Sequence, residues 1–182
     1  MTKKIILAGF WSHTHCEESF SKQITDYGMD VIPFKISNYF DKKWNNYLNA
    51  IPLPMGAVLK INREFLALVK SNKIDYVFLW NCNHFLPSTL REVKARNIKI
   101  VVYNNDDPYG SVLANKKPWI HFFQFFWFLK SLYFADLIFV YRPVNIKEAA
   151  QYVKPSSEIK LFKPYFIPSE DKTHTKEKQY KQ

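Results

Sequence analysis

The first thirty residues constrain the fold more than any other part of the chain. An apolar run over residues 5–8 is typical of a buried strand. Thr14 and Glu17 follow with the spacing of a capping box at a helix start, apolar residues then recur at helical spacing, and Gly28 ends the helix. A second strand is expected at 29–34. Strand, tight loop, helix and strand in this order predict the opening unit of a doubly wound α/β domain.

The remaining chain repeats this theme of an apolar strand followed by a helix. Further strands are expected at 75–80, 98–103, 136–141 and 159–166, and helices at 57–71, 87–96, 118–134 and 144–152. Residues 35–56 indicate a long loop with a short helix, and such loops are often functional lids. The predicted fold is a doubly wound, Rossmann-like parallel sheet of about six strands in one domain over 3–168. The polar residues 169–182 are expected to form a tail or the start of an interdomain linker.

Composition and motifs narrow the classes of ligand and partner. The formal charge of +10 favours an anionic partner such as a phosphate or a lipid head group, but the lysines are scattered, so no nucleic acid is expected. Cys16 and Cys82, with no secretory signal before them, predict a reducing cytoplasm. The His and Cys spacings match no familiar zinc site, so no metal is expected. The first loop has only Gly9 and lacks G-x-G-x-x-G, so no dinucleotide cofactor is expected either.

Polar side chains cluster where three of the predicted strands end. If the strand from residue 75 pairs beside the first, the loops after residues 8, 80 and 103 share one rim at the carboxyl edge of the sheet, where ligands bind in such folds. The rim candidates are Ser12, His13, Thr14, His15, Asn81, His84, Asn104, Asn105, Asp106 and Asp107. A histidine there suits proton removal from a hydroxyl. The alternatives stay open: the histidines help start the helix, and the two aspartates form a turn or bind a divalent cation.

Residues 118–134 form the most unusual segment, an aromatic helix with one narrow polar stripe. It is too short and too interrupted to span a membrane. It is either buried against the sheet or an interfacial helix that contacts lipid head groups, with Lys116, Lys117 and Lys130 at the membrane surface. With so little polar surface, the helix needs a cover for its apolar faces, which are rarely exposed as large patches. Because the expected cover is the absent second half, one side is expected to be exposed in this chain, with several aromatic rings accessible.

Several segments, taken in order, resemble one protein family. Residues 9–20, with the sequence GFWSHTHCEESF, are similar to the N-terminal loop of CgeB-like, spore-maturation type bacterial glycosyltransferases. The match extends in the same order through residues 86–90, 103–108, 139–142 and 164–168. The resemblance implies the first of the two Rossmann-like domains of a GT-B glycosyltransferase, the half that faces the acceptor. In such enzymes the second domain holds most of the nucleotide-sugar.

The resemblance also implies roles for the rim residues. His13 is the expected base that takes the acceptor proton, and Asp106 or Asp107 orients that histidine or the acceptor hydroxyl. The other rim candidates, together with Arg142, are expected to bind the acceptor, which is an unidentified glycan or a lipid-linked molecule.

The region 164–168 is where the linker to a second domain is expected to begin. We therefore expect this chain to be a truncated or split half, to use a nucleotide-sugar donor only with a C-terminal partner domain, and to be inactive alone. No cofactor is expected. The expected location is the cytoplasm, peripheral to the inner face of the membrane if residues 118–134 contact lipid. The alternative is a non-enzymatic Rossmann-like binding module or a truncated remnant.

Overall fold

The computed structural model describes residues 2–11, 14–40, 46–81, 83–110 and 118–162. Its centre is a six-stranded sheet in which every neighbouring pair of strands is parallel. The strands are β1 (Lys4–Gly9), β2 (Asp30–Lys35), β3 (Tyr76–Trp80), β4 (Lys99–Asn104), β5 (Leu137–Val140) and β6 (Glu158–Leu161). Helices separate them along the chain, so the predicted doubly wound α/β class is confirmed.

The helices lie where the apolar periodicity predicts them, within a few residues at each end. They are α1 (Ser19–Asp26), α2 (Asn46–Ala50), α3 (Gly56–Ser71), α4 (Pro87–Lys94), α5 (Trp119–Ser131) and α6 (Pro143–Ala149). Shorter turns are the π-helix η1 (Thr14–Glu18) and the 3-10 helices η2 (Ile36–Tyr39), η4 (Leu132–Phe134) and η5 (Ala150–Tyr152). The short helix expected within residues 35–56 is α2. Gly28 ends the first helical segment with φ of +84°, a backbone angle that a glycine adopts without strain.

The strand order β2-β1-β3-β4-β5-β6 places the first strand inside the sheet. Leu7 lies opposite Pro33 of β2 on one side and Phe78 of β3 on the other. The predicted pairing of the first and third strands is therefore confirmed. The chain leaves β1 toward one edge of the sheet and then crosses back to build the other half. This reversal creates a topological switch point between β1 and β3.

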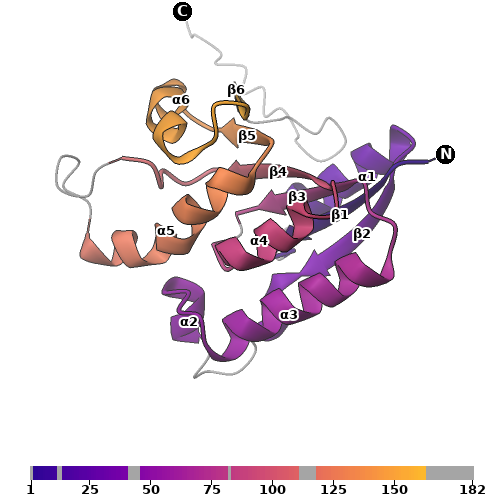
Figure 1. The fold of residues 1–182 in the computed structure, drawn as a ribbon, viewed down its shortest axis with the longest axis horizontal. Coiled ribbons are helices and arrows are strands. Elements are labelled where there is room, and N and C mark those ends of the chain that lie inside the picture. The colour runs from indigo at the N-terminus through magenta and orange to yellow at the C-terminus, as the bar shows by residue number, and fades with distance from the viewer. Residues whose placement is uncertain (1, 12–13, 41–45, 82, 111–117, 163–182) are drawn as a thin grey trace, which may run out of the picture.

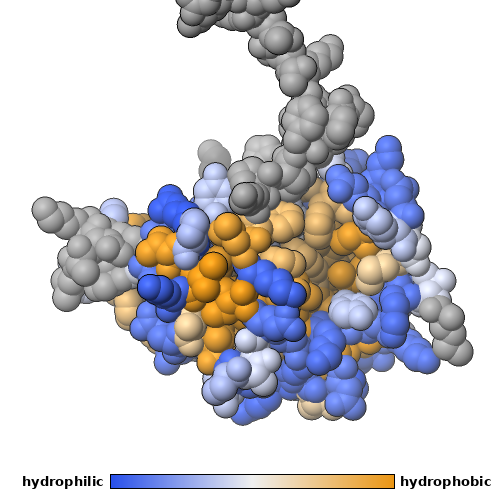
Figure 2. Space-filling model, turned by 90° about the horizontal axis from the view of Figure 1, so that it is seen from above, coloured by the Kyte–Doolittle hydropathy of each residue, from blue (hydrophilic) through white to orange (hydrophobic). Residues whose placement is uncertain are grey.

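The two faces of the sheet are covered unequally. Figure 1 shows α3, α4 and α5 side by side below the sheet, and their apolar side chains form the larger core with alternate residues of the strands, such as Ile6, Val77 and Ile100. On the opposite face α1 packs Phe20 onto Phe78 and Trp80 of β3, at ring distances of 4.9 and 5.1 Å. Figure 2, seen from above, shows hydrophobic residues gathered into a broad area bordered by hydrophilic ones.

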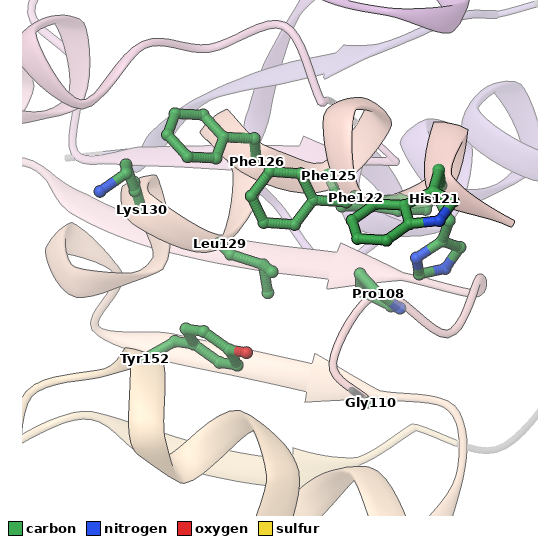
Figure 3. Close-up of a pocket in the computed structure, with 10 residues that line it drawn as sticks. Pro108, Gly110, His121, Phe122, Phe125, Phe126, Leu129, Lys130 and Tyr152 are labelled. Carbon is green, nitrogen blue, oxygen red and sulfur yellow. The ribbon is translucent and has the colours of Figure 1, made fainter. Parts of the chain in front are cut away.

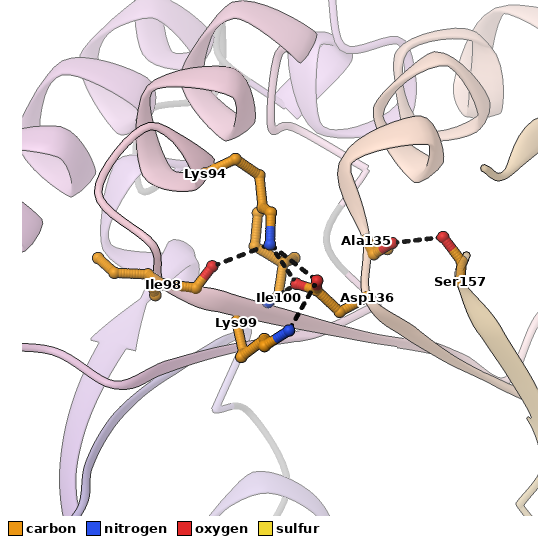
Figure 4. A network of polar contacts seen from close by, with 7 residues as sticks. All are labelled: Lys94, Ile98, Lys99, Ile100, Ala135, Asp136 and Ser157. Atoms are coloured by element: carbon orange, nitrogen blue, oxygen red, sulfur yellow. Dashed lines mark hydrogen bonds and ion pairs between the residues drawn. The ribbon is translucent and has the colours of Figure 1, made fainter. Parts of the chain in front are cut away.

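A carboxylate network ties the amino edge of the sheet together (Figure 4). The Lys94 ammonium at the end of α4 donates to Asp136 at 2.7 Å, and the Ile100 amide of β4 donates to the same carboxylate at 2.8 Å. Burial raises the pKa of Asp136, but these donors and the Lys99 charge outweigh burial, so the net pKa is lower than usual. The network fixes the starts of β4 and β5 at the edge opposite the polar rim.

Candidate functional site

The loops after β1, β3 and β4 lie at one edge because all the strands run in the same direction. The first two loops meet through the rings of Phe10 and His84, whose centroids are 5.7 Å apart. The second and third loops meet through a pair of asparagines: the Asn81 side-chain oxygen accepts the Asn105 backbone N–H at 2.9 Å, and the Asn81 amide donates to the Asn105 side chain. The expectation that these three loops share a rim is therefore confirmed.

Asparagine side chains set the shape of the rim. Asn81 has φ of +47°, a left-handed conformation that asparagine tolerates better than most residues. Asn104 is fully buried, and its amide donates to Asn83 at 3.2 Å while its oxygen accepts the Asp106 backbone N–H at 2.8 Å. Asn104 therefore positions the turn that carries Asp106, and it does not face a substrate as the sequence predicts. Asn81 and Asn105 remain at the surface of the rim.

Asp107 is held in place by partners from α6. The Asn145 amide donates to one carboxylate oxygen at 2.8 Å, and Arg142 forms an ion pair with the other at 3.3 Å. The His121 Nε2–H on α5 donates to the backbone carbonyl of Asp107 at 2.9 Å. Arg142 still exposes about half of its side chain, 54%, so its remaining donors are available to an anionic or hydroxylated ligand. Asp107 thus joins three elements at the rim.

Asp106 has the electrostatics of a proton acceptor. Asp106 is exposed at the rim, yet nearby protein atoms displace part of the water around its carboxyl group. This partial desolvation raises the pKa of Asp106. The neighbouring His121 acts in the opposite direction and lowers the pKa of Asp106. A carboxylate with a raised pKa holds a proton more readily than an ordinary aspartate does. Asp106 is therefore a rim carboxyl that can take part in hydrogen bonding to a proton donor at the surface.

His84 lies inside the protein and does not line the rim. Its ring is 1% exposed and packs against Phe10 and Phe40, and Nε2 lies 3.2 Å from the Asn49 carbonyl oxygen. Burial lowers its pKa to about 4, so the imidazole is neutral near pH 7. The sequence prediction of a substrate contact at His84 is wrong because the loop after β3 turns this side chain toward α2.

The β3–α4 loop is also fastened from α3 by a buried amide. Asn62 donates to the His84 backbone carbonyl at 2.8 Å and accepts the Leu86 backbone N–H at 2.9 Å. The sequence did not mark Asn62 as important. A signal was present, since Asn62 is a polar residue on the apolar face of a helix, where a buried amide needs partners.

The first loop carries a buried carboxylate at the end of β1. Glu17 accepts the Phe10 backbone N–H at 2.8 Å, so it reaches seven residues back, farther than a capping box predicts. A Cβ built on Gly9 would lie 2.6 Å from the same oxygen. In dinucleotide-binding folds the turn after the first strand binds a phosphate. Here the Glu17 carboxylate already lies against Gly9 and the Phe10 amide in this turn. Ser12 and His13 lie outside the described residues, and for Thr14 and His15 only the backbone of η1 is described.

A groove of about 520 Å³ adjoins the rim on the side of α5. Figure 3 shows the side chains of α5 in a row from Lys130 to His121, with Tyr152 of η5 and Pro108 of the β4 loop across from them. The lining residues are Pro108, Gly110, Trp119, His121, Phe122, Phe125, Phe126, Leu129, Lys130 and Tyr152. The sequence identified the aromatic helix but not this groove, because Tyr152 and Pro108 join it only through the fold.

The expectation that one side of the aromatic helix is exposed is confirmed for α5. Trp119 is 69% exposed and Phe123 is 50% exposed, whereas Phe125 and Phe128 on the other side are buried in the larger core. Among the described residues, none of the helices combines the length and the apolar composition that crossing a bilayer requires. The part of the chain that the structure describes contains no group of three or more His, Cys, Asp or Glu side chains placed to hold a metal ion.

Comparison with known proteins adds no relative. No family model matches the sequence, and no curated protein matches it at a significant level.

Proposed function

We propose that this chain is the acceptor-side, Rossmann-like half of a GT-B type glycosyltransferase. The observation that carries the proposal is the joined rim of polar loops at the carboxyl edge of a doubly wound sheet, next to a groove of small-molecule size. The resemblance of residues 9–20 and of the four later segments supports the same family. The nucleotide-sugar is bound chiefly by a second domain; the Glu17 carboxylate, which accepts the Phe10 backbone N–H at the end of β1, supports this because it would oppose a phosphate there.

The proposed reaction is the transfer of a sugar to an acceptor hydroxyl at the rim. The hydroxyl oxygen forms a bond to the anomeric carbon of the donor as a base takes the hydroxyl proton. The bond between the anomeric carbon and the phosphate oxygen breaks, and the nucleotide leaves with the electron pair. His13 is the proposed base. Asp106 orients the base or the acceptor hydroxyl, and its raised pKa suits contact with a proton in transfer.

The surrounding residues have distinct roles in this scheme. Arg142 and Asn105 are exposed and supply donors for acceptor hydroxyls. Asp107 is a positioning residue, because it ties Arg142 and Asn145 to the β4 loop. Asn81 and Asn104 hold the turn of Asp106.

The test is sugar transfer from labelled nucleotide-sugars into glycan and lipid-linked acceptor pools, with this chain and a donor-binding domain supplied together. We expect transfer only when both halves are present, and a loss of about tenfold or more for Asp106→Asn if it contacts the transferred proton. Asp26→Asn, an exposed aspartate at the end of α1, is the matched control. Equal rates for both variants would remove Asp106 from the reaction. If the chain binds an acceptor but no combination with a donor-binding domain transfers sugar, the result would instead favour a non-enzymatic binding module.

A further inference from the structure

The groove beside α5 has the size and the lining of a small-molecule site. Its volume of about 520 Å³ lies in the range of sites that enclose a ligand of drug size. Most lining residues are aromatic or aliphatic, and their side chains form both walls. The polar side chains in the lining are His121, Lys130 and Tyr152. A free sugar would bury many hydroxyl groups against rings that offer no hydrogen bonds, so the lining favours a ligand with an apolar body.

Lys130 is the one ammonium among the described residues that line the groove. Lys130 lies at one end of the row, with its ammonium 5.0 Å from the centroid of the Phe126 ring. A second ammonium, that of Lys154, lies 5.3 Å from the Tyr133 ring just beyond α5. Among the described residues that line the groove there is no carboxylate, and α5 contains no acidic residue. The carboxylates that act on lining residues are those of Asp106, beside His121, and Glu148, beside Tyr152, so the end of the groove at Lys130 is the one that suits an acidic group. An apolar ligand that carries an acidic group therefore complements the groove better than a neutral or cationic one.

We propose that the groove between α5 and η5 binds an anionic amphiphile. The apolar chain lies along Phe122, Phe126 and Leu129, and the acidic group pairs with Lys130 at the end of the groove that is farther from the rim. The proposal goes beyond glycosyl transfer and does not depend on it, since it requires neither a donor nor a second domain.

A flat bilayer is the other apolar surface that α5 could contact, through exposed residues such as Trp119, Ile120 and Phe123. The groove is favoured because Tyr152 of η5 faces the side chains of α5, so the site has two walls. A bilayer surface does not reach between two such walls, whereas an extended chain does. Two adjacent phenylalanines distinguish a ligand in the groove from contact with a flat bilayer. Phe122 lines the groove and Phe123 does not, although their exposed fractions are similar, 45% and 50%.

The experiment titrates the full chain with cis-parinaric acid, a fluorescent fatty acid, below its critical micelle concentration. We expect saturable binding of the fatty acid, about tenfold weaker in Phe122→Ser because part of the bound hydrocarbon chain loses its apolar contact with the protein. We expect less than about a twofold change in Phe123→Ser, because it removes similar apolar surface outside the groove. A thermal melt of each variant confirms that it is folded. Absence of saturable binding, or equal weakening by both substitutions, overturns the groove site.

A second arm tests the charge with dodecyl phosphate, dodecyl maltoside and dodecyltrimethylammonium as competitors of the bound fatty acid. We expect the phosphate to compete best, and Lys130→Gln to weaken it about tenfold while leaving the maltoside unchanged. Equal competition by the three head groups would refute the acidic-group assignment. If the chain binds vesicles of anionic phospholipid but not the soluble fatty acid, α5 is a membrane-contact surface and the proposal is wrong.

Discussion

The imidazole of His84 packs against the rings of Phe10 and Phe40, and its Nδ1 has no hydrogen-bond partner among the described residues. Burial therefore disfavours the charged form, and the pKa falls to about 4 from an ordinary value near 6.5. The folded state keeps this imidazole neutral between the two values, whereas the unfolded chain binds a proton there. The contribution of His84 to stability is complete above about pH 6.5 and is lost as the pH falls toward 4.

The prediction at this scale is a change in the pH dependence of unfolding in His84→Phe. The phenyl ring keeps the ring contacts but does not titrate. We expect the free energy of unfolding of the parent protein to fall by roughly 3 kcal/mol more than that of the variant between pH 7 and pH 4. Urea denaturation of the two proteins at several pH values measures this difference, in which other titrating groups cancel. Parallel pH profiles would show that His84 is not a buried neutral imidazole.

At the scale of elements, β1 and η1 are joined by a close contact between Gly9 and Glu17. A Cβ at position 9 would meet Glu17 at 2.6 Å, so the carboxylate would have to leave the Phe10 amide. We expect Gly9→Ala to lower the free energy of unfolding by about 1 to 3 kcal/mol, as overpacking does. The cost should largely vanish when Glu17 is already alanine, and urea denaturation of the four proteins of this double-mutant cycle measures the coupling. An equal cost in both backgrounds would mean that backbone geometry, not the carboxylate, requires the glycine.

Asp136 joins α4, β4 and β5 through hydrogen bonds to Lys94 and Ile100. Asp136→Asn keeps the shape but removes the charge, so we expect a loss of about 2 kcal/mol at pH 7. Because the pKa of Asp136 is lowered in the folded state, its stabilisation is present above its unfolded pKa and is lost as the pH falls through the folded value. In Asp136→Asn, this loss of stability at acid pH should be absent. Asp26→Asn serves as the exposed control, and a similar loss there would attribute the effect to net charge.

For the whole molecule, the prediction concerns the donor. The end of β1 already holds the Glu17 carboxylate, so a nucleotide diphosphate approaching this turn would meet a like charge. We expect the chain alone to show no appreciable rise in melting temperature with any nucleotide-sugar. Thermal denaturation across a panel of these donors tests this, with the free nucleotides as controls. A micromolar dissociation constant, equivalent to roughly −8 kcal/mol, would show that this domain carries the donor site itself.

The sequence by itself determined the class of fold and the edge on which the rim lies. Apolar runs and helical spacing are local properties, and parallel strands joined by helices place their carboxyl ends together, so the loops of Asn81 and Asn105 meet as predicted. The aromatic composition of 118–134 likewise predicts the character of the exposed side of α5, because any side of this helix that the fold leaves uncovered is apolar.

Only the tertiary structure decided which rim side chains point outward and what joins them. His84 turns inward because Phe10 and Phe40 surround it, and those contacts come from other segments of the chain. Asn145, 38 residues after Asp107, holds that carboxylate, and Tyr152 completes the groove opposite α5. A side chain's direction and burial depend on partners that are distant in sequence. The local periodicity that predicts strands and helices therefore does not predict these distant partners.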